Sequence, residues 1–185
     1  MLAEIRAFIG EDAELHVQVI SDTAEGMIAE AKKISAAFGK NTYVKIPSTP
    51  EGFAAMQALS KEGYLITATA IYTPMQAAYL AAKSGAHYAA PYINRIDNLG
   101  ADGIESAKKI QNIFDNNGFT TKILAASFKN SQQVQALCEY GVGAATIAPD
   151  VIEALVKNAS VESAVAAFTA DFEKLCGAGK TMLDC

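Results

Sequence analysis

Short apolar runs rich in β-branched residues alternate with longer helical patterns along almost the whole chain. The runs are Leu15–Ile20, Thr42–Pro47, Leu65–Tyr72, His87–Tyr92, Lys122–Ser127 and Ala144–Pro149. Strands separated by helices of about 10–15 residues are typical of βα units, which build a parallel sheet. The alternation therefore predicts an α/β fold made of about six βα units.

Local signals mark where the intervening helices begin. Thr49-Pro50-Glu51 and Thr73-Pro74 each predict a helix start, because proline at the first helical position lacks only an N–H that would have no partner. Further helices are expected at 24–38, 101–116 and 161–175, and from Ser131 and Asp150. A leading helix carries apolar residues on one face and needs a sheet to cover it; these are Leu2, Ile5, Phe8 and Ile9.

The number of strands bears on how the sheet closes. A βα barrel has eight strands, so two strands and one helix are expected upstream of Met1. The predicted fold is a TIM (β/α)8 barrel, incomplete at its N-terminal side, in one domain over residues 1–185. An open doubly wound sheet agrees with the alternation too. The strands at 15–20 and 144–149 are expected to have bare edges, which invite pairing with other chains.

Charge and composition argue against nucleic-acid-binding, membrane and metal-binding proteins. A net charge of −5 and a pI near 5.0 give no indication of binding to nucleic acid or to an anionic membrane. No apolar run is long enough for a membrane span, and the start is unlike a signal or transit peptide. Three cysteines and two histidines in no zinc-binding spacing predict no metal. A cytoplasmic protein is expected.

Polar side chains share one face of three successive predicted strands. Alternation puts Gln18, Lys45 and Thr69 on that face, with apolar residues opposite. In a barrel the apolar face meets the helices, and inward polar residues near the carboxyl ends of strands form the active site. This predicts a site around Lys45. His16 and His87 are expected to pack within their strands.

Lys45 is the most informative of these residues. Burial inside a strand should depress the pKa of its ammonium, and a neutral amine is the nucleophile that forms a Schiff base with a ketone. The alternative is a lysine at a strand edge whose ammonium reaches solvent.

Several segments, taken in order, resemble the transaldolase family, and most closely its small-subunit branch of fructose-6-phosphate aldolases. They are Asp22–Met27, Tyr43–Pro47, Ala90–Asp97 and Leu124–Lys129. The resemblance implies that Lys45 forms an imine with a dihydroxyacetone-type donor, without a cofactor. It also implies that Gln18, Thr69 and Tyr92 position water and a proton.

The same resemblance distinguishes two activities. The transaldolase branch commonly has Glu and Phe where this chain has Gln18 and Tyr92. A tyrosyl hydroxyl can act as a general acid or base and a phenyl ring cannot, which favours an aldolase over a transaldolase. A first-strand Asp and second-strand donor-binding residues of the family would lie upstream of Met1. A catalytically silent remnant that binds sugar phosphate or a partner chain is therefore a third hypothesis.

The resemblance further implies a phosphate-binding site and an assembly. Arg95 and Ser127 are expected to meet the substrate phosphate, with Asn94 orienting the loop or the substrate. The alternative role for Arg95 is an ion pair with Asp97 or another surface carboxylate. The alternative role for Ser127 is a helix N-cap. Tyr72 and Gln76 follow the Thr69 strand and could also line the site, but the preferred interpretation is a packing residue for Tyr72 and an exposed helix residue for Gln76. Helix and tail 161–185 are expected to pack on a neighbouring subunit of a ring-type, pentamer-based homo-oligomer.

Overall fold

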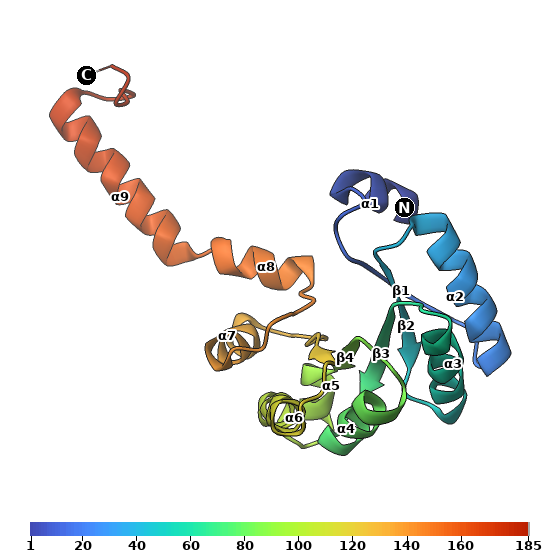
Figure 1. The fold of residues 1–185 in the computed structure, drawn as a ribbon. Helices are drawn as coiled ribbons and strands as arrows, with labels where there is room; N and C mark the ends of the chain where they lie inside the picture. Colours follow the sequence, from blue (N-terminus) through green and yellow to red (C-terminus); the bar gives the residue numbers. More distant parts are fainter. Residues whose placement is uncertain (185) are drawn as a thin grey trace. The chain divides into compact units, whose positions relative to one another are not determined.

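The chain forms two compact units, residues 1–147 and a second one that begins at Ala148. The computed structural model describes residues 1–184 (Figure 1). The first unit contains a sheet of five parallel strands in chain order, each hydrogen-bonded to the next. The strands are β1 (Leu15–Gln18), β2 (Thr42–Pro47), β3 (Ile66–Ile71), β4 (Tyr88–Pro91) and β5 (Lys122–Ile123).

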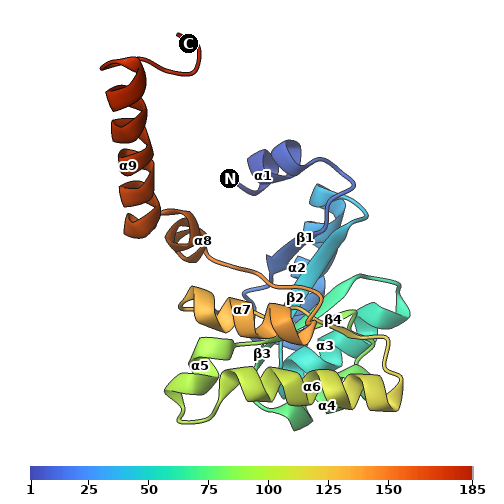
Figure 2. The ribbon, with the colours of Figure 1, turned by 90° about the vertical axis from the view of Figure 1, so that its left-hand side faces the viewer.

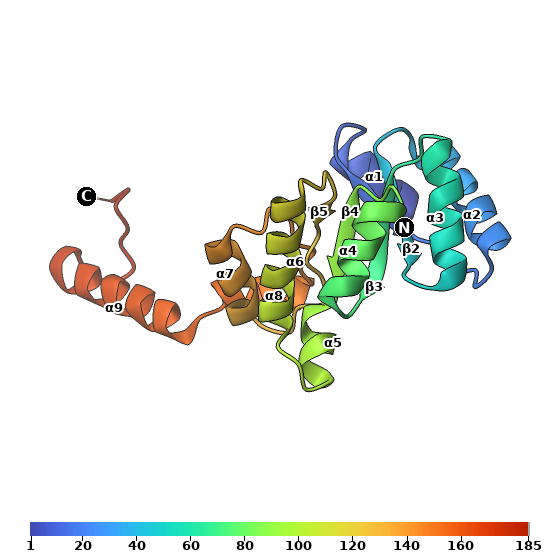
Figure 3. The ribbon, with the colours of Figure 1, turned by 60° about the horizontal axis from the view of Figure 1, so that its bottom comes forward.

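Helices follow the strands and cover the outer side of the curved sheet (Figures 1 and 3). Neighbouring helices pack in pairs, α2 on α3, α4 on α6 and α6 on α7, the last pair being clear in Figure 2. The helices of this unit are α1 (Leu2–Ile9), α2 (Ala24–Phe38), α3 (Pro50–Lys61), α4 (Pro74–Lys83), α5 (Ile93–Asn98), α6 (Gly103–Asn117) and α7 (Ser131–Tyr140). The predicted α/β class with a parallel sheet is confirmed, and it is consistent with part of a βα barrel.

Local chemistry explains the helix starts. The Thr49 side chain accepts a hydrogen bond from the Gly52 N–H, and Pro50 occupies the first turn of α3. Thr73 and Gln76 form a complete capping box at the start of α4. In a capping box each side chain satisfies a backbone N–H that the helix leaves unpaired. α2 is capped by Thr23 and α7 by Asn130.

The two faces of the sheet differ as the alternation predicts. Along β2, Thr42, Val44 and Ile46 are buried, whereas Tyr43, Lys45 and Pro47 are only half-buried. The buried side chains join those of the helices in an apolar layer that includes Met27, Ile46, Met56, Leu59, Ile66, Ile110 and Phe114. Burying each of these large side chains stabilises the fold by about 1.5–3 kcal/mol. The opposite, inner face keeps the polar side chains.

The predicted sixth strand at 144–149 does not form. Ala145 makes one isolated parallel bridge with Ala125, and the Thr146 N–H donates to the Ala125 carbonyl. Pro149 already lies in the next helix, and proline has no N–H for a strand ladder. β5 is likewise short, and the chain beyond it pairs with Tyr92 only through Ala126.

Helix α1 forms where it is expected, but its apolar face is only partly covered, with Leu2 and Ile9 half-buried. None of its residues is buried, and the Phe8 side chain is 92% exposed. Arg6 ties the helix to the rest of the unit, because its Nη1 donates to the carbonyls of Gly10 and Ala13, both at 2.8 Å. Among the described residues no strand covers Phe8, and the sheet that this helix face is expected to need stays a prediction.

The second unit holds α8 (Pro149–Val156) and α9 (Ala159–Cys176). α9 exposes a row of apolar side chains, Val161, Val165 and Phe168, which are 55%, 55% and 70% exposed. Among the residues described, no helix has the length and hydropathy needed to cross a bilayer.

Candidate active site

Lys45 lies on the inner face of the sheet, between two neighbouring strands. Its register partners are Gln18 on β1 and Thr67 on β3. Thr67 is fully buried, and Lys45 is half-buried. Removal of the ammonium from water lowers the pKa of Lys45. A lowered pKa increases the fraction of neutral amine, which is the form that attacks a carbonyl.

Thr69 and Tyr92 form a hydrogen-bonded pair toward the carboxyl edge of the sheet, which is the edge where the strands end. The Thr69 hydroxyl, 1% exposed, donates to the Tyr92 hydroxyl at 3.0 Å. Tyr92 directly follows β4, and its backbone N–H donates to Ile71 on β3. Since the Tyr92 oxygen accepts from Thr69, its own proton is available for a substrate oxygen or for water.

Two residues other than glycine have positive φ within the described chain, and both lie at this carboxyl edge. They are Ala70, with φ 57°, and Ser127, with φ 61°. Ala70 lies in a β-bulge, since the register between β3 and β4 shifts between Ala68 and Ile71. Such conformations cost about 1–3 kcal/mol each and gather at functional sites. The strain therefore points to the same region as the polar side chains.

Ser127 and Asn94 come together through their backbones. The Asn94 N–H donates to the Ser127 carbonyl at 3.0 Å, and the neighbouring Ile93 N–H donates to Ala126. These bonds join the segment after β5 to the first turn of α5. The helix-cap alternative for Ser127 is wrong, because Asn130 caps α7.

Arg95 lies against Tyr92 on the exposed side of this edge. Its guanidinium carbon is 4.6 Å from the centre of the Tyr92 ring. Hydrogen bonding to Tyr72 raises the pKa of Arg95. The alternative role, an ion pair with Asp97, is not formed: Asp97 accepts from the Gly103 N–H at 2.7 Å and from the Gln133 amide at 2.6 Å.

Gln18 ends β1 beside Lys45, but its side chain is exposed and turned to its own strand. Its amide nitrogen donates to the Val19 carbonyl at 3.0 Å. The structure thus brings Tyr92 into contact with both Thr69 and Arg95. Lys45, Gln18, Ser127 and Asn94 lie on neighbouring elements. Among the described residues, no group of three or more His, Cys, Asp or Glu is arranged to hold a metal ion.

Tyr72 lies beside this site, although the packing role was the preferred interpretation of the sequence. Its ring meets the Tyr92 ring edge-on, with centroids 5.8 Å apart. Its backbone N–H donates to the Gln76 side chain at 3.0 Å, so the capping box also fixes the start of the loop. The sequence contained one signal for this, the Thr73-x-x-Gln76 spacing after a strand.

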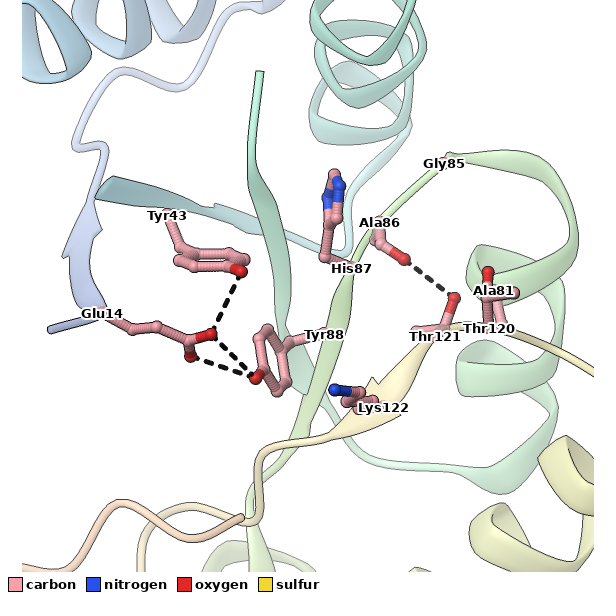
Figure 4. A pocket seen from close by; sticks show the side chains of 10 residues that line it. All are labelled: Glu14, Tyr43, Ala81, Gly85, Ala86, His87, Tyr88, Thr120, Thr121 and Lys122. Atoms are coloured by element: carbon pink, nitrogen blue, oxygen red, sulfur yellow. Dashed lines mark hydrogen bonds between the residues drawn. The ribbon is translucent and has the colours of Figure 1, made fainter. Parts of the chain in front are cut away.

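A second polar cluster lies at the amino edge, where the strands begin. The Glu14 carboxylate accepts from the Tyr43 hydroxyl at 3.2 Å and from the Tyr88 hydroxyl at 3.0 Å (Figure 4). These side chains border a cavity of about 240 Å³. Burial and the Glu14 carboxylate raise the pKa of Tyr88 to about 12.

The two histidines lie near this cluster. The His16 ring stacks on Tyr43 with centroids 4.7 Å apart, and its Nδ1 lies 2.8 Å from the Thr67 hydroxyl oxygen. Burial lowers the pKa of both His16 and His87. His87 Nδ1 accepts a hydrogen bond from the Ile66 N–H. His16 packs among the strand residues, whereas His87 directly precedes β4 and is exposed, so its expected packing within a strand is not observed.

Residues 1–182 match the family described as Transaldolase/Fructose-6-phosphate aldolase. The chain belongs to this family. A probable fructose-6-phosphate aldolase of Streptococcus pneumoniae is 42% identical over 171 residues, 92% of this chain and 77% of the relative. A probable transaldolase of Maridesulfovibrio salexigens is 39% identical over 164 residues, 89% of this chain and 76% of the relative. The predicted family is thus confirmed.

Two solved structures share the fold at low sequence identity. One is a dipeptide epimerase from Enterococcus faecalis, with a TM-score of 0.56 at 14% identity, covering 78% of this chain and 41% of that one. The other is an inosine 5′-monophosphate dehydrogenase from Legionella pneumophila, also with a TM-score of 0.56 at 14% identity, covering 76% and 45%.

Proposed function

We propose that this chain is a Schiff-base aldolase that cleaves or forms fructose 6-phosphate, with Lys45 as its nucleophile. One observation carries the proposal: a lysine with a burial-lowered pKa shares the inner face of the sheet with the Thr69–Tyr92 pair. Family membership supports it, since the matched family includes both aldolases and transaldolases.

The proposed reaction begins with attack of the Lys45 amine on the ketose C2 carbonyl. Loss of water gives a protonated imine, which draws electrons from the C3–C4 bond as the C4 hydroxyl loses its proton. Glyceraldehyde 3-phosphate leaves, and an enamine remains on Lys45. Protonation of its carbon and hydrolysis release dihydroxyacetone. The protonated imine is the electron sink, so this chemistry needs no metal.

Tyr92 is the proposed proton carrier for these steps. Its hydroxyl is oriented by Thr69 and is free to donate. Gln18 is proposed to orient water beside Lys45, its partner in register. Arg95 and Ser127 are proposed to bind the phosphate, and Asn94 to hold the Ser127 segment in place.

Borohydride trapping tests the proposal. With dihydroxyacetone or fructose 6-phosphate, reduction should fix an adduct on Lys45, which intact mass and peptide mapping detect. Lys45→Met should give no adduct, and Lys40→Met, a change at an exposed lysine, should leave it intact. An unmodified Lys45 in the unsubstituted chain would contradict the mechanism. An adduct that forms without released products would instead favour a chain that binds sugar phosphate without turnover.

Transaldolase activity is the second candidate, favoured by the relative described as a probable transaldolase. Reaction with fructose 6-phosphate and erythrose 4-phosphate separates the two. Free dihydroxyacetone indicates an aldolase, and sedoheptulose 7-phosphate indicates transfer. Tyr92→Phe should reduce release of free dihydroxyacetone more than it reduces trapping, because the enamine then lacks its proton donor.

We also propose that α9 packs on a neighbouring copy in a ring-type homo-oligomer. Val161, Val165 and Phe168 recur at helical spacing and are largely exposed, a pattern that favours burial against a partner. Phe168→Glu should lower the sedimentation coefficient, whereas Glu162→Gln on the same helix should not. An unchanged coefficient for Phe168→Glu would contradict this role.

A further inference from the structure

Tyr72 occupies the carboxyl edge because of a backbone irregularity. Strict alternation along β3 would place Tyr72 on the face opposite Thr69. The bulge at Ala70 adds one residue to the strand, and an added residue reverses the alternation that follows it. Tyr72 therefore reaches the Tyr92 ring, and Tyr92 in turn bonds to Thr69.

The loop that carries Tyr72 is held firmly. The Gln76 side-chain oxygen accepts from the N–H groups of Tyr72 and Thr73, at 3.0 and 3.1 Å. This oxygen belongs to the capping box of α4, so the position of Tyr72 is tied to a helix. These bonds fix the backbone of Tyr72, and its ring then packs edge-on against the Tyr92 ring.

Arg95 provides the long, flexible side chain that lies over the Tyr92 ring. Arg95 is exposed, yet its guanidinium carbon lies 4.6 Å from the centre of the Tyr92 ring, which the Tyr72 ring also meets edge-on at 5.8 Å. Interaction with the Tyr72 side chain raises the pKa of Arg95. A free arginine loses much rotamer freedom when it binds an anion, and that loss weakens binding. An arginine that two tyrosines already hold has less freedom to lose.

We propose that Tyr72 is a positioning residue that determines specificity for phosphorylated substrates, by holding Arg95 over the Tyr92 ring. The inference rests on the proposed function, in which Arg95 meets the sugar phosphate. Immobilising one long side chain in advance corresponds to a change in affinity of about 3- to 10-fold. This gain applies to ligands with a phosphate, because dihydroxyacetone has no group for Arg95 to bind.

The test compares two ligands in the trapping reaction of the full chain. In Tyr72→Phe, which keeps the ring and removes the hydroxyl, the half-saturating concentration of fructose 6-phosphate should rise about 3- to 10-fold. The value for dihydroxyacetone should move by less than about 2-fold. Tyr79→Phe is the matched control, since Tyr79 is exposed on α4 and packs on Phe53; it should change neither value. Equal shifts for both ligands, or no shift, would overturn the proposal.

Arg95→Gln should abolish the preference for the phosphorylated ligand, and Tyr72→Phe should have no further effect in that background. An additive effect would mean that Tyr72 does not act through Arg95.

A second readout needs no imine. Inorganic phosphate is titrated against the full chain while the Arg95 Nε–Hε signal is followed by NMR, and Tyr72→Phe should weaken binding about 3- to 10-fold. An Arg95 signal that phosphate does not move, or a Tyr72→Phe variant with unchanged affinity, would overturn the inference. Absence of trapping with a normal phosphate titration would instead count against the aldolase reaction alone.

Discussion

Replacing Tyr88 by phenylalanine should make the stability of the chain less sensitive to alkaline pH. The Tyr88 hydroxyl donates to both oxygens of Glu14, at 3.0 and 3.3 Å, and the residue is 8% exposed. Its pKa rises from 10.0 to about 12. In the unfolded chain the phenol ionises near pH 10, while the folded chain still holds its proton. Folding stability is therefore lost as the pH rises from about 10 to about 12.

The magnitude follows from the size of this shift. A shift of about two pKa units corresponds to about 2.7 kcal/mol. Near neutral pH the variant lacks the hydrogen bond to Glu14, whose side chain is 47% exposed. That loss should cost about 1–1.5 kcal/mol, because water replaces part of the interaction. Tyr72 and Tyr92 lie at the carboxyl edge of the sheet and do not contribute to the free energy of the Tyr88–Glu14 interaction.

The two effects have opposite signs, so the order of stabilities should reverse. Tyr88→Phe should be less stable than the unsubstituted chain at about pH 8, and more stable by about 1 kcal/mol at about pH 12. Urea unfolding followed by far-ultraviolet circular dichroism measures both. Tyr79→Phe removes an exposed hydroxyl that lies away from Glu14 and serves as the control. A stability difference between Tyr88→Phe and the unsubstituted chain that stays constant from pH 8 to pH 12 would show that the Tyr88 pKa is not raised by folding.

Three further substitutions probe the inner face and its support. Thr69→Val removes the bond to Tyr92 at nearly constant volume; trapping with dihydroxyacetone should slow about 5- to 10-fold, and an unchanged rate would separate Thr69 from catalysis. Ser127→Gly removes the strain of a side chain at φ 61°, so the free energy of unfolding in urea should rise by up to about 1 kcal/mol. The yield of the trapped adduct with fructose 6-phosphate should fall in the same variant. Gly52→Ala puts a Cβ 1.9 Å from the Pro47 carbonyl oxygen and should cost about 3 kcal/mol in the same unfolding assay; a cost below about 1 kcal/mol would show that the backbone can yield.

The alternation of strand residues was sufficient to predict which side chains face inward along β1 and β2. Period-two patterning predicts a face only while the strand stays regular. The bulge at Ala70 breaks that condition, so strand period alone could not decide between the two interpretations of Tyr72, packing or a place beside the site, and the contact with Tyr92 follows from the bulge. An alanine with positive φ leaves no mark in a sequence.

The other differences between the sequence predictions and the structure also arise from tertiary contacts that a local pattern does not contain. The run at 144–149 has the composition of a strand, but a strand exists only where a neighbour supplies a full ladder of hydrogen bonds, and Ala145 finds a single bridge. Glu14 lies in a predicted loop, so its two tyrosine partners on β2 and β4 follow from the tertiary fold and not from local pattern. The inward position of Lys45 was predicted because it depends on strand period alone.

The carboxyl and amino edges of the sheet carry opposite energetic roles. At the carboxyl edge, Ala70 and Ser127 hold strained backbone; on the same inner face, Lys45 carries a charge that burial disfavours. The strained backbone and the buried charge both lower the stability of the fold. Both favour the chemistry proposed above, because imine formation needs a neutral amine and a fixed backbone around the site. At the amino edge, Glu14 accepts from two tyrosines and His16 stacks on one of them, contacts that stabilise without exposing a reactive group. This division matches the general behaviour of βα barrels, in which reaction belongs to the carboxyl face and stability to the opposite one.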